Sequence, residues 1–167
     1  YVSSLSLNGY SLLEPGAGSG LISFYASQNG ARVTATDINP VAIEYLQKNS
    51  KKNNVEIRVI QSDLFDSIPK EQFDIIAINP PYYRKDPETW KDHAWYCGKN
   101  GEYFSRLFND LSYYTHKDSI TLMVLCEGCD LKMIRSYAER SNFLLTLVLT
   151  KQNILEKNFI YKIEKQL

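Results

Sequence analysis

Apolar runs of strand length alternate with longer stretches of helical pattern along the chain. This alternation is typical of a mostly parallel sheet with helices covering both of its faces. The pattern predicts strands at residues 10–14, 32–37, 55–60, 73–79, 120–126, 143–150 and 158–164. It predicts helices at residues 20–30, 39–54, 101–115 and 129–142. We therefore expect an α/β fold built on a seven-stranded, mostly parallel sheet.

The composition is that of an ordinary globular chain. Its 167 residues, 44% of them hydrophobic, are enough to bury one core, so residues 1–167 are predicted to form a single domain. No apolar run reaches the roughly 18 residues that a membrane span needs, and no export leader precedes the first strand. We therefore expect a cytoplasmic protein that does not enter a membrane. Equal numbers of basic and acidic residues, 19 of each, disfavour binding to a long tract of nucleic acid but allow a local basic patch.

The three cysteines are expected to be reduced thiols, because their number is odd and no leader is present. Cys126 and Cys129 form a CxxC between a predicted strand and a predicted helix, the setting of a thioredoxin-type redox pair. Two ordinary buried or half-buried thiols are the favoured alternative. The other candidate zinc ligands, Cys97, His93 and His116, are scattered without a recognisable spacing, so no metal is expected.

Residues 82–100, "YYRKDPETWKDHAWYCGKN", are the one long stretch without clear periodicity. A segment of this length inside a compact domain is usually functional or disordered. Its two tryptophans favour a lid that packs on something. The alternative is a surface excursion with a small aromatic cluster of its own.

A glycine-rich loop connects the first predicted strand to the first predicted helix, in "LLEPGAGSGLISF". Gly16, Gly18 and Gly20 would let a ligand approach the backbone without interference from side chains. The dinucleotide fingerprint GxGxxG needs a glycine where this chain has Leu21, which disfavours NAD. Glu14 before the loop could orient it or accept a hydrogen bond from an ammonium group. The structural alternative is a tight strand-to-helix turn that needs glycine for steric reasons.

Two acidic residues follow the ends of the next two predicted strands, which is the ligand-binding edge of an open parallel sheet. Asp37 stands about twenty residues beyond the glycine loop, where a carboxylate can accept hydrogen bonds from ribose hydroxyls. Asp63 could meet an adenine amino group, with Leu64 beside the ring. Either carboxylate alone would more often cap a helix, although Asn39 before Pro40 is itself a good N-cap.

The fourth predicted strand stops at Asn79, Pro80, Pro81 and Tyr82. The simple explanation is that proline cannot continue a central strand. A chemical explanation comes from the motifs taken together. "EPGAGSG", "TDINP", "SDLFD" and "NPPYY" resemble the class I S-adenosylmethionine-dependent methyltransferases over nearly the whole chain.

The resemblance implies a Rossmann-like sheet of seven strands with an antiparallel last strand, and S-adenosyl-L-methionine as cofactor. It places the methionine end of the cofactor at Glu14, Gly16, Gly18 and Gly20. It assigns Asp37 to the ribose and Asp63 with Leu64 to the adenine. Ile38 and Asn79 complete the expected cofactor site.

The NPPY sequence is used in that family to methylate nitrogen conjugated to a π-system. An amide nitrogen is a poor nucleophile because its lone pair is delocalised into the carbonyl. The side-chain oxygen of Asn79 and the carbonyl of Pro80 offer two acceptors for the amide N–H groups, which would aim the lone pair at the methyl group. Tyr82 would stack on the planar substrate group. The catalytic residues implied are therefore Asn79, Pro80 and Tyr82.

The segment "HAWYCGKNGEYFSRLF" resembles part of the glutamine methyltransferases that modify peptide-chain release factors. The matching positions are Trp95, Gly98, Gly101 and Glu102. The departures are Cys97 for the first glycine, Asn100 for the usual aspartate and Tyr83 for the usual valine. The resemblance implies a glutamine side-chain amide as substrate and allows for a small activating subunit. It also implies an upstream segment, which is either missing from this chain or dispensable in a minimal form.

Two alternatives stay open at this point. The substrate could be an exocyclic amine of adenine or guanine in RNA or DNA, contacted by a patch of Arg84, Lys85, Lys91 and Lys99. Tyr83, Trp90 and Trp95 could stack on a flipped base or pack on a protein loop. The second alternative is a non-catalytic binding subunit with the methyltransferase fold. The oligomeric state is left open.

Overall fold

The computed structural model describes residues 1–152 and 157–166, and all seven predicted strands are present in it. They are β1 (Ser11–Pro15), β2 (Arg32–Asp37), β3 (Ile57–Gln61), β4 (Phe73–Ile78), β5 (Thr115–Cys126), β6 (Phe143–Gln152) and β7 (Lys157–Lys165). They form one sheet in the order β3-β2-β1-β4-β5-β7-β6. β1 to β5 pair in parallel, whereas β7 runs antiparallel to both β5 and β6. The predicted fold class is confirmed.

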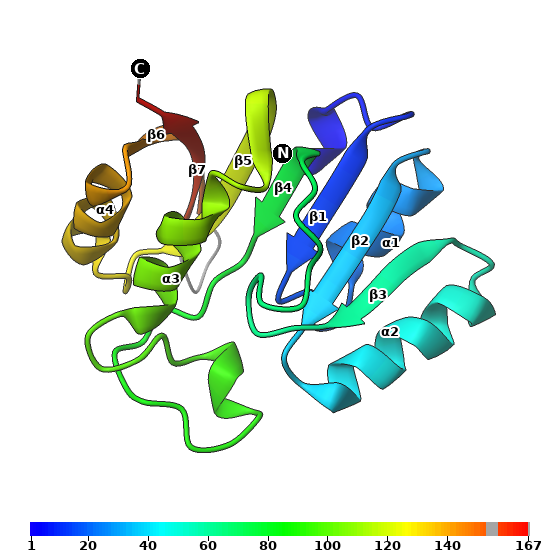
Figure 1. The fold of residues 1–167 in the computed structure, drawn as a ribbon, viewed down its shortest axis with the longest axis horizontal. Helices are drawn as coiled ribbons and strands as arrows, with labels where there is room; N and C mark the ends of the chain where they lie inside the picture. The colour runs from blue at the N-terminus through cyan, green and yellow to red at the C-terminus, as the bar shows by residue number, and fades with distance from the viewer. Residues whose placement is uncertain (153–156, 167) are drawn as a thin grey trace.

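The strand order reverses between β1 and β4, because β2 and β3 extend the sheet to one side of β1 and the later strands extend it to the other (Figure 1). In an open α/β sheet, ligands bind beyond the carboxyl ends of the strands at such a switch point. The glycine loop follows β1 and the NPPYY segment follows β4. Both candidate motifs therefore lie at this one place in the fold.

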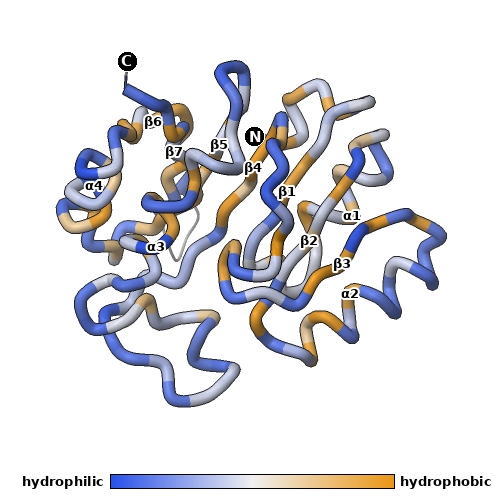
Figure 2. Tube along the Cα trace, viewed as in Figure 1, coloured by the Kyte–Doolittle hydropathy of each residue, from blue (hydrophilic) through white to orange (hydrophobic). Residues whose placement is uncertain are grey.

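The predicted helices are confirmed as α1 (Leu21–Gln28), α2 (Pro40–Lys52), α3 (Glu102–Leu111) and α4 (Leu131–Arg140). Neighbouring strand residues pack on opposite faces of the sheet. Leu12 and Ile75 belong to an apolar cluster with α1, whereas Leu13 and Ile76 belong to the main cluster with α3 and α4. Successive side chains of a strand point to opposite faces, so helices cover the sheet on both sides. Figure 2 shows the apolar residues concentrated on the central strands.

The third helix is shorter than its pattern predicts. The prediction extended it to residue 115, but α3 ends at Leu111 and β5 begins at Thr115. Tyr114 explains the early end, because its ring stacks on Phe65 with centroids 4.4 Å apart and its hydroxyl donates to the backbone carbonyls of Phe65 and Ile68. Those tertiary contacts outweigh the helical pattern of the segment.

Two short 3-10 helices, η1 (Val2–Ser4) and η2 (Asp92–Ala94), were not predicted. η2 lies inside the 82–100 segment, which Figure 1 shows beyond the carboxyl ends of the central strands. Within the described part of the chain, no helix is long and apolar enough to cross a bilayer.

The CxxC cysteines lie at the junction of β5 and α4. Cys126 ends β5, and the Sγ atoms of Cys126 and Cys129 are 3.6 Å apart as thiols. The backbone N–H of Cys126 also donates to Cys129 Sγ at 3.2 Å.

Candidate active site

The glycines of the loop between β1 and α1 serve two different purposes. Gly20 has a φ of 75°, and a Cβ atom on it would collide with Leu46 Cδ2, so this glycine allows α1 to pack against α2. A Cβ atom on Gly16 or Gly18 would meet nothing within 4 Å, although both residues have positive φ angles of 70° and 52°. The backbone at Gly16 and Gly18 is therefore open to a ligand, whereas Gly20 serves the packing of the fold.

Glu14 is buried behind the loop and does not line the cavity described below. Its Oε2 accepts hydrogen bonds from the backbone N–H and the hydroxyl of Ser23, in the first turn of α1. Burial raises the pKa of Glu14 to about 7, and the bonds from Ser23 only partly offset this effect. Of the two roles considered from the sequence, this placement favours orienting the loop over contacting an ammonium group.

Asp37 ties the end of β2 to the glycine loop. Its Oδ2 accepts a hydrogen bond from the Gly18 N–H at 2.8 Å, and its Oδ1 accepts from the Asn39 N–H at 2.8 Å. Asn39 caps α2 through a 3.0 Å bond from the Val41 N–H, as its sequence context predicts. Because Asn39 supplies the N-cap of α2, Asp37 is not needed as a cap. Its carboxylate instead holds the glycine loop and lines the cavity.

Asp63 and Leu64 follow β3 and enter the same cavity. Leu64 is buried and has a φ of 50°, a left-handed conformation that costs a non-glycine residue about 1–2 kcal/mol. Such strain concentrates at functional sites. The Asp63 carboxylate is paired with Arg106 of α3, a partner that no sequence motif indicated.

The NPPYY segment is held in place by the far end of the 82–100 segment. The backbone N–H groups of Tyr82 and Tyr83 both donate to the Trp95 carbonyl, at 3.2 and 2.9 Å, and the Cys97 N–H donates to the Tyr83 carbonyl at 2.9 Å. Asn79 and Pro81 line the cavity, whereas Pro80 is buried and Tyr82 half-buried outside its lining.

A cavity of about 460 Å³ joins these elements. Seven of the predicted residues line it: Gly16, Gly18, Asp37, Ile38, Asp63, Leu64 and Asn79. The other four, Glu14, Gly20, Pro80 and Tyr82, do not. The volume lies within the range of about 300–1,000 Å³ that is usual for small-molecule sites.

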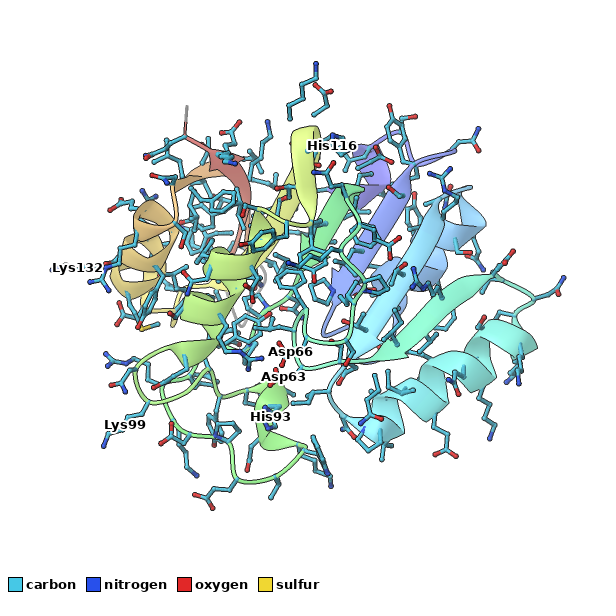
Figure 3. The ribbon with its side chains drawn as sticks, viewed as in Figure 1. Asp63, Asp66, His93, Lys99, His116 and Lys132 are labelled. Carbon is cyan, nitrogen blue, oxygen red and sulfur yellow. The ribbon has the colours of Figure 1, made fainter. Side chains whose placement is uncertain are left out.

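The 82–100 segment and α3 form the cavity wall that the motifs did not reveal. Trp90 and His93 line it from the segment, with ring centroids 6.1 Å apart, and Tyr103 and Arg106 line it from α3. Figure 3 shows Asp63 and Asp66 beyond the ends of the central strands, and Asp63 and His93 line the same cavity. Of the two tryptophans behind the lid prediction, Trp90 lines the cavity and Trp95 does not, and closure of a lid stays a prediction. A three-residue spacing on the predicted helix is the signal that could have identified Tyr103 and Arg106 together.

The charged groups at the cavity are mostly acidic. Asp37, Asp63, Asp86 and Glu102 line it together with one guanidinium, that of Arg106. An excess of carboxylates favours a ligand that carries positive charge.

Comparison with known proteins decides the family. Residues 2–95 match the family model described as the methyltransferase small domain, and this match spans more than half of the chain. The chain belongs to the methyltransferase small domain family. The resemblance to class I S-adenosylmethionine-dependent methyltransferases is thereby confirmed, and S-adenosylmethionine is the cofactor that this assignment supports.

Two sequence relatives are named after a specific methyl acceptor, glutamine. A Methanocaldococcus jannaschii protein named as an N5-glutamine methyltransferase is 36% identical over 115 residues, which cover 65% of this chain and 58% of that protein. The release factor glutamine methyltransferase of Streptococcus pneumoniae is 38% identical over 81 residues, which cover 47% of this chain and 29% of that protein. The chain thus matches less than two thirds of the length of either relative.

A solved structure shares the fold over almost the whole chain. It is the E. cuniculi Mtq2–Trm112 complex, described as responsible for methylation of the eRF1 translation termination factor. The TM-score is 0.71 at 21% identity, covering 98% of this chain and 88% of the other.

Proposed function

We propose that this chain is an S-adenosylmethionine-dependent N-methyltransferase whose substrate is a glutamine side-chain amide of a protein such as a peptide-chain release factor. One observation carries the proposal: Asn79, at the end of β4, lines the same cavity as Gly16, Gly18, Asp37 and Asp63. A group that can orient an amide therefore shares one space with the expected cofactor contacts.

The residues at the cavity fit the cofactor. Open space above the glycine backbone can receive the methionine end, and the excess of carboxylates suits a ligand with a sulfonium and an ammonium group. Asp37 would hold the ribose, and Asp63 with Leu64 would hold the adenine. Bound S-adenosylmethionine supplies an electrophilic methyl group on a positively charged sulfur.

The chemistry that remains for the chain is to orient the substrate amide. The Asn79 side-chain oxygen and the Pro80 carbonyl would accept hydrogen bonds from the two amide N–H groups. These bonds fix the amide plane and aim the nitrogen lone pair at the methyl group. Such orientation matters because the lone pair of a free amide is delocalised into the carbonyl. Two consecutive prolines and the bonds to Trp95 hold this backbone in place. Because the oxygens only accept and position, no protein nucleophile is required.

The surface around the cavity supports a protein substrate more than a nucleic acid. Two of the four basic residues near the NPPYY segment have acidic partners, since Arg84 pairs with Asp130 at 3.4 Å and Lys85 pairs with Glu88 at 3.9 Å. Such pairing weakens a patch that would have to bind phosphates. The exposed rings of Trp90 and Trp95 can pack on a protein loop.

The test is to incubate the chain with cofactor labelled in the methyl group and either a release factor or total RNA. The proposal expects label in the release factor and little dependence of its binding on salt. Label in RNA, together with binding that weakens steeply between low and moderate ionic strength, would favour methylation of an exocyclic amine instead.

A small activating subunit and a cytoplasmic location also belong to the proposal. The E. cuniculi structure is of a two-protein complex, and the thiols of Cys126 and Cys129 suit a reducing compartment. A chain that binds the cofactor but methylates the release factor only when such a subunit is added would support the first point.

A further inference from the structure

Arg106 is the basic residue of α3 that lines the cofactor cavity, and its guanidinium binds the loop after β3. Its Nη1 donates to Asp63 Oδ2 at 2.7 Å, and its Nη2 donates to Asp66 Oδ2 at 3.0 Å. Nη2 also lies 3.5 Å from the backbone carbonyl oxygen of Asp63. One guanidinium therefore holds both the side chain and the backbone of Asp63.

The two carboxylates that bind Arg106 are not equivalent. The Asp63 side chain is 41% exposed, whereas that of Asp66 is 61% exposed, so solvent screens the Asp66 pair more. Asp63 also lines the cavity, and Asp66 does not. The Asp63 contact is therefore the one able to affect a ligand, and Asp66 provides a built-in control.

The geometry leaves one oxygen of Asp63 available. Oδ2 is occupied by Arg106, and within residues 1–152 and 157–166 no hydrogen bond reaches Oδ1. The next residue, Leu64, holds a strained left-handed conformation, so the loop needs contacts that keep it in place. A planar guanidinium bound to a carboxylate restricts the rotation of that carboxylate.

We propose that Arg106 is a positioning residue, which fixes the Asp63 carboxylate so that Oδ1 accepts a hydrogen bond from the exocyclic amine of the cofactor's adenine. This inference rests on the proposed function. Arg106 thereby links α3, directly after the 82–100 segment, to selection of the adenine base. A hypoxanthine base presents a carbonyl at that position and would be repelled by the carboxylate.

The experiment compares two ligands, S-adenosylhomocysteine and S-inosylhomocysteine, which differ in that exocyclic group. Calorimetry gives the Kd of each for the wild type, and we expect the adenosyl compound to bind at least about tenfold more tightly, as befits a hydrogen bond to a charged group. Arg106→Met should bring the ratio of the two constants close to one, mainly by weakening the adenosyl compound. Arg106→Lys, which keeps a charged donor, should give a ratio between that of the wild type and that of Arg106→Met.

Three further variants make the test specific. Asp63→Ala should lower the ratio as much as Arg106→Met, and the double variant should lower it no further, because both remove the same interaction. Asp66→Asn should leave the ratio unchanged. Arg58→Met removes the exposed Arg58–Glu71 pair of 2.6 Å away from the cavity and should also leave it unchanged.

Equal weakening of both ligands in Arg106→Met, or an unchanged ratio, would overturn the positioning role. If Arg106→Met does not fold, the same comparison in Arg106→Lys decides, since an undiminished ratio there contradicts the proposal. A wild-type chain that binds neither ligand would refute the proposed function itself, and the positioning role with it.

Discussion

The buried carboxyl of Glu14 makes a sharp prediction about stability. Its pKa is raised from the ordinary 4.5 to about 7 by burial, so the folded state holds this proton more tightly than the unfolded state does. The stability that the group contributes is complete below pH 4.5 and is lost as the pH rises through about 7. At about 1.4 kcal/mol for each pKa unit, the full effect amounts to about 3 kcal/mol.

Glu14→Gln keeps the shape of the side chain and removes the titration. The free energy of unfolding, measured by urea denaturation between pH 5 and pH 8, should fall by about 2–3 kcal/mol more in the wild type than in the variant. The depressed carboxyl pKa values of Asp74 and Glu164 act at lower pH and do not interfere with this window. Parallel curves for the two proteins would show that Glu14 ionises normally and refute the reasoning.

Ser23→Ala offers a matched variant, because it removes one of the two hydrogen bonds that favour the charged carboxylate and leaves the backbone N–H in place. The pH at which the wild type loses stability should therefore move upward in Ser23→Ala. Movement to lower pH would contradict the role given to this bond.

The remaining predictions concern the NPPYY segment, the ribose contact and the glycine loop. Asn79→Ala should leave S-adenosylmethionine binding nearly intact in calorimetry and lower methyl transfer by about 100-fold or more in a tritium assay, and unaltered turnover would remove Asn79 from the mechanism. Asp37→Ala should do the reverse and weaken cofactor binding about tenfold or more, so an unchanged Kd would exclude the ribose contact. Gly20→Ala should cost about 2–5 kcal/mol of stability in urea, because its Cβ would collide with Leu46 and its φ of 75° is left-handed as well, whereas Gly18→Ala should cost only about 1–2 kcal/mol for its positive φ. Equal losses at the two glycines would contradict the different roles assigned to them.

Much of the fold was predictable because the local spacing of apolar residues indicates which positions are buried. The strands are short apolar runs bounded by turn residues, and the strand ends bring Asp37, Asp63 and Asn79 to one edge of the sheet whatever the loops do. The early end of α3 was not predictable, since it depends on Tyr114 stacking on Phe65, a contact across 49 residues of sequence.

The candidate site divides in the same way. The cavity-lining residues of the glycine loop and the strand ends belong to short motifs and could be predicted from the sequence. His93 comes from a long segment whose position depends on tertiary packing, and no spacing in the sequence indicated it; Arg106 shares a helix face with Tyr103, but that spacing alone does not tell which face meets the cavity. Glu14 was predicted from its place before the glycine loop, but the sequence left two roles open, orienting the loop or accepting from an ammonium group. Its burial and its bonds to Ser23 favour the first role.

The central claim is that Asn79 presents a substrate amide to a methyl donor held over the glycine loop. Its most direct test is mass spectrometry of a release factor after incubation with the chain and S-adenosylmethionine. The account predicts that one glutamine side chain gains the mass of a single methyl substitution, and that Asn79→Ala abolishes this gain while still binding the cofactor. A release factor left unmodified under conditions in which RNA or DNA acquires the methyl group, or a glutamine methylated equally well by Asn79→Ala, would contradict it.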